Sequence, residues 1–275
     1  MRLDVYVAEY WPEQSRSTWQ KLIKSGAVKV NGEVITLPKH ELGEDDYVSV
    51  EQPIPPDFSA DSLPILYEDD DVIVINKPVG VLTHSKGALN DEFTVAEFVR
   101  PKTTYKADTN RPGIIHRLDR ATSGVLLCVK NEEAAAYLQR QFSERKVKKM
   151  YMAVVSGIPP EPRAVLDLPI GRNPAKPSTF RVDPNGKPAE TYYEVLNHDD
   201  RHALVKLQPH TGRTHQLRVH MAYVGTPIIG DTVYGFETAE RMYLHAAALE
   251  ITLPGGKRTT FEAPLPPEFS QQVAA

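Results

Sequence analysis

Six short apolar segments are spread along the chain after residue 70, and helix-forming patterns do not alternate regularly with them. Each is rich in β-branched or aromatic residues, which is typical of strands. A doubly wound sheet would need a helix between successive strands. The order therefore favours an α+β fold with a mixed, mainly antiparallel sheet and flanking helices. One helix is predicted over 131–143, with Asn131 as its N-cap. The segments are 71–78, 124–129, 151–155, 191–196, 203–207 and 246–252.

A proline-rich stretch divides the sequence into two parts. Four prolines fall within residues 53–64, and each of them fixes φ and lacks a backbone donor. We therefore expect an extended linker over 53–64, an amino-terminal domain over 1–52 and a larger domain over 65–275. A length of 275 residues is compatible with two domains.

The first 52 residues predict a small α+β domain, with two short helices leading into a small sheet. Ser17 has capping-box spacing, and an apolar stripe at helical spacing follows it. Asn31 and Gly32 come after an alternating segment and form a strong hairpin signal. The helix also carries the cations Arg16, Lys21 and Lys24. Such a basic face is more often a solvated surface than a binding site.

The net charge of −4 argues against a nucleic-acid partner, because proteins that engage phosphates usually carry a basic excess. The charges are unevenly distributed, however. Residues 139–149 carry five Lys or Arg against one acid, and residues 201–220 carry four Lys or Arg, four His and no acid. Acids cluster instead at 41–46 and 68–71. A polarised surface is expected, and polarity matters more than the total charge for steering a polyanion.

Cysteine usage points to a reducing compartment. The single cysteine, Cys128, lies in an apolar run and is expected to be buried in a strand. One thiol excludes an internal disulfide and a thiolate zinc cluster. The chain has no apolar stretch of membrane-spanning length, and residues 1–4 lack the order of a signal peptide. We expect a cytoplasmic protein.

Residues 113–124 combine apolar residues with polar side chains that can take part in chemistry. Among them, Asp119 lies between Arg117 and Arg120. Nearby cations favour an ionised carboxylate. A salt-bridged loop aspartate and a reactive one are equally compatible with this segment alone. A protein-kinase interpretation fails, because Leu118 interrupts the His-Arg-Asp order and no glycine-rich phosphate loop is present.

The segment 211–225 is predicted to be a helix, with Thr211 or Thr214 at its start and Gly225 at its end. Arg218 lies off the apolar stripe, so its guanidinium could pair with a carboxylate such as Asp119. A metal site made by His210, His215 and His220 is disfavoured. On a helix a spacing of five turns successive residues by about 140°, and we expect no metal and no cofactor.

Three segments together resemble the RluA family of RNA pseudouridine synthases, namely 113–124, 149–157 and 211–221. Residues 76–84 resemble the opening strand and loop of that family, and residues 227–235 its later glycine-rich stretch. The resemblance covers residues 65–270. Residues 1–51 are similar to the small S-four-like RNA-binding fold, which often precedes this catalytic domain.

The resemblance implies a role for individual residues. Asp119 would be the catalytic aspartate, Tyr151 the aromatic ring that stacks on the target base, and Arg218 the partner of Asp119. Arg117 would help displace the base and fill the gap it leaves. His116, Arg120 and Leu217 would contact the substrate. The expected RNA-binding residues are Arg16, Lys21, Lys24, Arg145, Lys146, Lys148, Lys149 and Arg213.

Conversion of uridine to pseudouridine breaks the bond from C1′ to N1 and joins C1′ to C5. It needs one ionised carboxylate, which either attacks C1′ or removes a ribose proton to form a glycal. Hydrolysis would need a second carboxylate to activate water. The implied partner is structured RNA, with large-subunit ribosomal RNA preferred over transfer RNA. The alternatives are a non-catalytic RNA-binding or ribosome-assembly factor, and an RNA glycosidase or nuclease.

Overall fold

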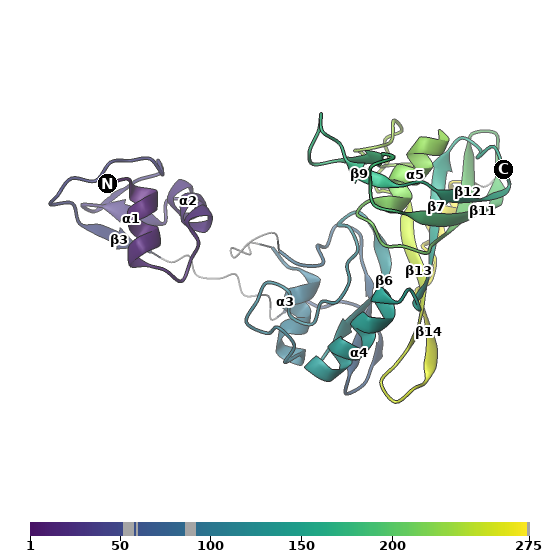
Figure 1. Cartoon of the computed structure of the whole chain (residues 1–275), viewed down its shortest axis with the longest axis horizontal. Helices are drawn as coiled ribbons and strands as arrows, with labels where there is room; N and C mark the ends of the chain where they lie inside the picture. Colours follow the sequence, from purple (N-terminus) through teal and green to yellow (C-terminus); the bar gives the residue numbers. More distant parts are fainter. Residues whose placement is uncertain (52–57, 59, 86–91, 274–275) are drawn as a thin grey trace. The chain divides into compact units, whose positions relative to one another are not determined.

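The computed structural model describes residues 1–51, 58, 60–85 and 92–273. The chain divides into two compact units, one formed by residues 1–60 with 85–93 and the other by residues 61–84 with 94–275 (Figure 1). Half of the linker predicted over 53–64 lies outside the described residues, so its extended form and the domain boundaries stay predictions.

The first unit contains two helices and a three-stranded antiparallel sheet in the order β2-β1-β3. Helix α2 buries Trp19 and Ile23 completely in the core of this unit. The elements are α1 (Leu3–Tyr10), α2 (Arg16–Lys24), β1 (Val28–Val30), β2 (Glu33–Val34) and β3 (Val48–Val50).

Local signals in this unit are mostly confirmed. Asn31 and Gly32 adopt φ of 52° and 84°, as the turn between β1 and β2 requires. The predicted cap at Ser17 is wrong. Ser15 precedes the helix instead, and its Oγ accepts a hydrogen bond from the backbone N–H of Thr18.

The second unit is built on a nine-stranded sheet with the order β4-β5-β6-β13-β7-β12-β11-β8, and β14 pairs with β13. Every pairing is antiparallel except that of β6 with β13, so the predicted mixed, mainly antiparallel sheet is confirmed. The strands are β4 (Ile65–Glu68), β5 (Val72–Lys77), β6 (Ser123–Val129), β7 (Lys148–Ser156), β8 (Arg163–Asp167), β11 (Glu190–His198), β12 (His202–Pro209), β13 (Leu244–Thr252) and β14 (Arg258–Glu262).

A separate short hairpin and five helical segments complete the unit. The hairpin pairs β9 with β10. Asn131 caps α4 by accepting a hydrogen bond from the Ala134 N–H at 2.8 Å, which confirms the predicted helix. Among the described residues, no helix has the length and apolar character needed to cross a membrane. The segments are β9 (Ile170–Arg172), β10 (Phe180–Val182), α3 (Val95–Val99), η1 (Arg100–Lys102), α4 (Glu132–Ser143), α5 (Gln216–Val224) and α6 (Pro267–Gln271).

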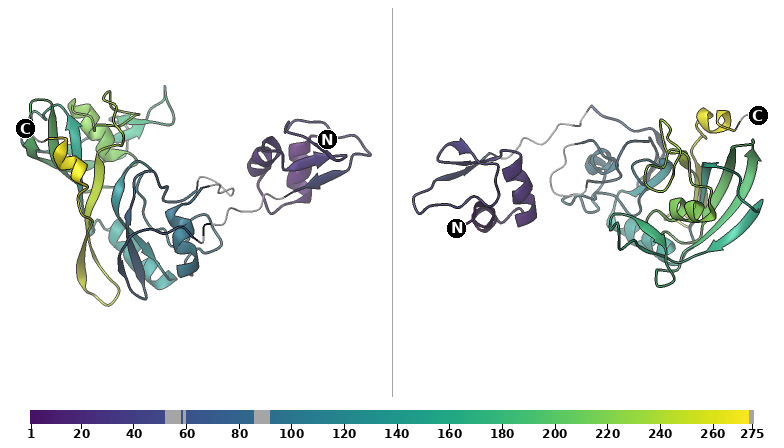
Figure 2. Two further views of the ribbon diagram at one scale, coloured as in Figure 1. Left: turned by 180° about the vertical axis from the view of Figure 1, so that it is seen from behind. Right: turned by 90° about the horizontal axis from the view of Figure 1, so that it is seen from above.

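Two clusters of buried side chains hold the sheet and its helices together. One joins α5 to β7 and β12, elements of the larger unit that Figure 2 shows from two further sides, and α6 adds Phe269 to it. The other joins α4 to β5, β6 and β13. Cys128 is fully buried in β6, as predicted. Asp119 precedes β6, Tyr151 lies on β7 and Arg218 on α5, so the two clusters fix the elements that carry these three residues.

Candidate active site

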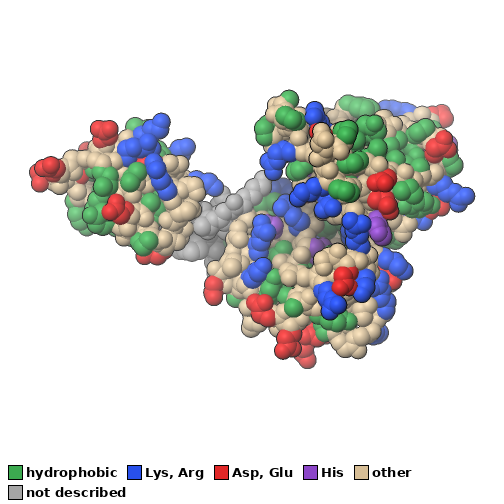
Figure 3. Space-filling view, in the orientation of Figure 1, with side chains coloured by type: hydrophobic (Ala, Val, Ile, Leu, Met, Phe, Trp, Pro, Cys, Tyr) green, Lys and Arg blue, Asp and Glu red, His purple; other side chains and the backbone are tan. Residues whose placement is uncertain are grey.

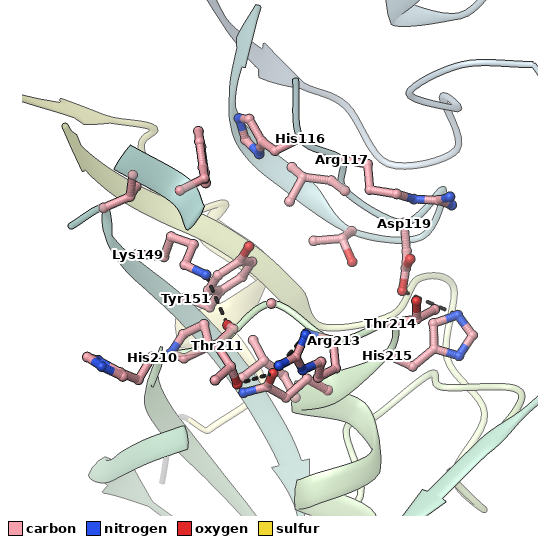
Figure 4. Close-up of a pocket in the computed structure, with 18 of the residues that line it drawn as sticks. His116, Arg117, Asp119, Lys149, Tyr151, His210, Thr211, Arg213, Thr214 and His215 are labelled. Atoms are coloured by element: carbon pink, nitrogen blue, oxygen red, sulfur yellow. Dashed lines mark hydrogen bonds and ion pairs between the residues drawn. The ribbon is translucent and has the colours of Figure 1, made fainter. Parts of the chain in front are cut away.

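A pocket of about 530 Å³ opens where the loop before β6, the start of β7 and the segment 209–218 meet (Figure 4). Asp119 is the only carboxylate among the described residues that line it. Lys and Arg side chains surround the hollow in the larger unit (Figure 3). The cations that line the pocket are Arg117, Arg145, Lys149, Arg213 and Arg218. The pocket is therefore suited to a negatively charged ligand.

Arg218 joins Asp119 to a second, fully buried carboxylate. Its Nη1 lies 3.1 Å from Oδ2 of Asp119, while Nε and Nη2 donate to Asp231 at 2.7 and 2.8 Å. The Asp231 carboxylate also accepts the backbone N–H groups of Val233 and Tyr234. Burial would raise the pKa of Asp231, but the hydrogen bonds and charge of Arg218 hold it below its ordinary value. Asp231 was not singled out from the sequence, and only the resemblance of residues 227–235 pointed to its surroundings.

Helix α5 begins later than predicted. Its first residue is Gln216, and the preceding His215 adopts a left-handed conformation with φ of 57°. Neither Thr211 nor Thr214 caps the helix, so that prediction is wrong. Thr211 instead donates its hydroxyl to Oε1 of Gln216, which also accepts the Arg213 N–H. Gln216 thereby orders the loop that carries the pocket residues into α5.

The loop that carries Asp119 is tied to the end of β5. Lys77 is fully buried, and its ammonium donates to the carbonyls of Pro78, Val81 and Arg120. Thr83 accepts the N–H of Leu118 and donates to its carbonyl. These bonds hold the backbone on both sides of Asp119, and the loop presents its side chain to the pocket.

The ion-pair partners of Asp119 come from across the pocket rather than from its sequence neighbours. Besides Arg218, Nε2 of His215 lies 3.6 Å from Oδ2 of Asp119. Arg117 and Arg120 are exposed, and Arg120 donates to the Gly80 carbonyl. The sequence pattern indicated cations near Asp119, but the cation that pairs with it is Arg218 of α5.

Tyr151 and Lys149 lie two residues apart on β7 and project into the same pocket (Figure 4). Burial raises the pKa of Tyr151 above its ordinary value, so the phenol is neutral. The ammonium of Lys149 donates to the Thr211 carbonyl at 3.0 Å, and burial lowers its pKa to about 8. The sequence grouped Lys149 with a basic surface, whereas the structure places its amine beside the aromatic ring.

His116 and Leu217 line the pocket, whereas Arg120 is not among the described lining residues, and substrate contact by all three stays a prediction. Nε2 of His116 accepts the Leu127 N–H, and its ring stacks on Phe142 with centroids 4.9 Å apart. Burial lowers the pKa of His116 to about 3, so the ring is neutral. Both side chains shape the wall of the pocket.

The predicted RNA-binding residues fall into three groups. Arg145 and Arg213 line the pocket together with Lys149, whereas Lys146 and Lys148 lie outside it and pair with Glu144 and Glu250. The third group belongs to the first unit, where Lys21 and Lys24 are exposed and Arg16 pairs with the buried Asp4. The RNA-binding role of all eight residues stays a prediction.

The three histidines weighed as a metal site do not converge. His210 and His215 line the pocket, but His220 is buried and bonds to Thr191 and to the Leu168 carbonyl. Among the described residues, no group of three or more His, Cys, Asp or Glu side chains is arranged to hold a metal ion.

Solved structures support the fold. The chain is 32% identical to human RNA Pseudouridylate Synthase Domain Containing 1, with a TM-score of 0.63 over 77% of this chain and 86% of the human one. It is 28% identical to human RNA Pseudouridylate Synthase Domain Containing 4, with a TM-score of 0.60 over 75% and 90% of the two chains.

Sequence comparisons confirm the two resemblances. The model of the RNA pseudouridylate synthase family matches residues 71–223, and the S4 domain matches residues 1–48. An uncharacterized RNA pseudouridine synthase of Aquifex aeolicus is 40% identical, over 86% of this chain and 78% of the relative. The ribosomal large subunit pseudouridine synthase D of Pasteurella multocida is 35% identical, over 100% and 90% of the two chains. The chain therefore belongs to the RNA pseudouridylate synthase family, and an S4 domain precedes its catalytic domain.

Proposed function

We propose that this RNA pseudouridine synthase uses Asp119 as its catalytic carboxylate on a uridine of large-subunit ribosomal RNA. The observation that carries the proposal is the pairing of Asp119 with Arg218, which is itself anchored on Asp231. A buried guanidinium at 3.1 Å stabilises the anionic form of a carboxylate in a partly desolvated pocket. Both routes, attack on C1′ and removal of a ribose proton, need that anion.

The charge composition of the pocket favours isomerisation over hydrolysis. A glycosidase that uses water needs two carboxylates a few ångströms apart. Asp119 is the one carboxylate among the described lining residues, and Arg218 separates it from Asp231. With no second carboxylate to activate water, the detached uracil is the natural group to rejoin C1′.

The target base must leave its stack to reach Asp119. Flipping a base costs a few kcal/mol, and stacking on an aromatic side chain returns roughly 1–3 kcal/mol. Tyr151 offers its ring inside the pocket, and the exposed Arg117 stands on the rim, where it can fill the vacated stack. We assign these two roles together with the catalytic role of Asp119.

The choice of ribosomal RNA rests on the relatives. Several of them, at about 35% identity over essentially the whole chain, are named ribosomal large subunit pseudouridine synthase D. The S4 match at residues 1–48 supports an RNA-binding domain over 1–52, and the synthase match at residues 71–223 supports a catalytic domain over 65–275. Transfer RNA is the alternative substrate.

The test compares wild type with Asp119→Asn on transcribed large-subunit ribosomal RNA and on transfer RNA. Wild type should form pseudouridine in the ribosomal transcript, and Asp119→Asn should form none while it still binds the RNA. Activity retained in that variant would overturn the role of Asp119. Modification of transfer RNA alone would overturn the substrate assignment. Released uracil or strand scission would indicate hydrolysis.

A further inference from the structure

The two carboxylate oxygens of Asp119 have different surroundings. Oδ2 lies 3.1 Å from Nη1 of Arg218 and 3.6 Å from Nε2 of His215. Among the residues that the structure describes, none donates a hydrogen bond to Oδ1. Oδ2 is thus paired with the Arg218 guanidinium and lies near His215, and Oδ1 is available to a substrate.

The contact between His215 and Asp119 decides which ring nitrogen carries hydrogen. At 3.6 Å the contact is longer than a hydrogen bond, but it is electrostatically favourable only with an N–H on Nε2 of His215, because a carboxylate oxygen is an acceptor. A neutral imidazole has a single N–H, which makes Nδ1 an acceptor. Nδ1 lies 2.8 Å from the hydroxyl oxygen of Tyr234, so the Tyr234 O–H must be the donor.

The same direction of donation continues from Tyr234 to the β9–β10 hairpin. The backbone N–H of Phe180 donates to the Tyr234 oxygen at 2.9 Å, which leaves the phenolic hydrogen for His215. The Phe180 and Tyr234 rings both meet the imidazole edge-on, at centroid distances of 5.6 and 5.5 Å. Phe180 of the hairpin and Tyr234 also belong to one hydrophobic cluster with Val219 of α5. The ring of His215 is therefore held between Phe180 and Tyr234.

The electrostatic surroundings agree with a neutral ring. Burial, reinforced by the positive charges of Arg218 and Arg117, lowers the pKa of His215, although Asp119 and Asp231 act in the opposite direction. The left-handed backbone of His215, with φ of 57°, is costly for a residue with a side chain. Non-glycine residues persist in such conformations mainly where the surrounding structure specifies them.

We infer that His215 is a positioning residue whose Nε2–H, directed at Oδ2 of Asp119 by Tyr234 and the β9–β10 hairpin, favours Oδ1 as the reacting oxygen. The inference rests on the proposed catalytic role of Asp119. Hydrogen bonds run from the Phe180 N–H to the Tyr234 oxygen and from the Tyr234 hydroxyl to the His215 ring, whose Nε2 faces Oδ2 of Asp119 at 3.6 Å. This arrangement explains why a hairpin outside the pocket packs against the residue that precedes α5.

Nitrogen-15 NMR of the histidine rings in the full-length protein tests the tautomer without relying on activity. His215 is assigned by the signal that is lost in His215→Gln. At neutral pH we expect the hydrogen on Nε2 in wild type and a substantial Nδ1–H population in Tyr234→Phe. Tyr223→Phe is the matched control, because Tyr223 is an exposed residue of α5, and it should leave the His215 signals unchanged. Hydrogen on Nδ1 in wild type, or no change in Tyr234→Phe, would overturn the inference.

Kinetics then test whether the tautomer matters to the reaction. Tyr234→Phe keeps the ring but loses both hydrogen bonds, so kcat should fall by about 10-fold while KM for RNA changes by less than about twofold. A normal kcat in this variant would contradict a positioning role.

Two substitutions at position 215 separate positioning from a merely structural role. Glutamine places an N–H near the position of Nε2 of His215, whereas asparagine is too short but tolerates the left-handed backbone better. His215→Gln should therefore retain more activity than His215→Asn, and the reverse order would indicate only a backbone requirement. Because Asp119→Asn tests the carboxylate itself, its outcome is distinguishable from these.

Discussion

Asp231 binds Nε and Nη2 of Arg218, at 2.7 and 2.8 Å, and leaves Nη1 to reach Asp119 at 3.1 Å. The side chain of Asp231 has no exposed surface, and that of Arg218 is only 8% exposed. The buried carboxylate thus aims the guanidinium before any substrate arrives. Without Asp231, the Arg218 side chain would lose conformational entropy when its guanidinium bound Asp119. The bidentate pair with Asp231 already fixes the plane of the guanidinium.

Removal of the Asp231 carboxylate should therefore damage both stability and catalysis. In Asp231→Ala the Arg218 charge stays buried with only Asp119 to balance it, and breaking a buried pair costs about 3–5 kcal/mol. Urea unfolding should show that loss, and kcat should fall as well. Glu144→Gln is the control, because Glu144 pairs with Arg140 and Lys146 at the surface and should change neither quantity. Unfolding free energy equal to wild type in Asp231→Ala would show that the pair has no structural role.

Two substitutions of Tyr151 distinguish stacking on the base from a chemical role of the phenolic hydroxyl. Its pocket-lining ring would stack on the flipped base, so Tyr151→Phe should keep most of the activity. Tyr151→Ala should lose roughly 1–3 kcal/mol of transition-state stabilisation, about 5- to 150-fold in kcat/KM. Steady-state assays on the RNA transcript measure both. Equal losses in the two variants would indicate that the hydroxyl takes part in the reaction.

Arg145 carries a conformational cost that a glycine would remove. It follows α4 with φ of 57°, and its exposed side chain lies on the rim of the pocket. Arg145→Gly should raise the free energy of unfolding by about 0.5 kcal/mol, since only glycine adopts this φ without strain. The same change should weaken RNA binding and reduce the slope of log K against log salt by about 1.

Arg145→Lys is the matched control for this position. It keeps both the positive charge and the strained backbone, so stability and salt slope should stay close to those of wild type. A loss of stability in Arg145→Gly would mean that the arginine side chain makes a stabilising contact. An unchanged salt slope would remove Arg145 from the RNA interface.

Local signals in the sequence were enough for elements that are stabilised locally. The helix over 131–143 and the Asn31-Gly32 turn each depend on residues a few positions apart, and both are confirmed. The predicted start of α5 was wrong because threonine is a common N-cap residue, and both Thr211 and Thr214 precede the apolar stripe. The side chain of Gln216, which orders the preceding loop, competes for Thr211.

Contacts between residues that are distant in the sequence could not be predicted from local sequence patterns. The Arg218–Asp231 pair, the link from Tyr234 to His215 and the β9–β10 hairpin depend on segments that meet only in the folded chain. The parallel pairing of β6 with β13 joins Ser123 to His245. No periodicity within either strand specifies that neighbour. Asp119 was found because its charged surroundings are unusual within a single short segment.

Gly124 shows how that parallel pairing depends on one missing side chain. It has φ of 110°, and a Cβ at this position would overlap the backbone of Ala246. Gly124→Ala should lower the free energy of unfolding by more than about 3 kcal/mol, because backbone atoms cannot move aside. Gly255→Ala, with φ of 88° but no neighbour within 4 Å, should cost only the strain of about 1 kcal/mol. Equal effects in urea unfolding would exclude the steric explanation.

Lys149 should make stability depend on pH in alkaline solution. Burial lowers its pKa in the folded protein to about 8, from an ordinary value of 10.5. Between these values the unfolded chain binds more protons than the folded one, so the free energy of unfolding should rise with pH, by at most about 1.4 kcal/mol per pH unit. Lys149→Met has no such proton, and its stability relative to wild type should be highest below pH 8 and fall steadily up to pH 10.5. Burial also lowers the pKa of Lys77, to about 7. Because Lys77 is present in both proteins, the difference between their unfolding free energies reports on Lys149. Parallel stability curves for the two proteins would show that the Lys149 ammonium is as well solvated in the folded pocket as in the unfolded chain.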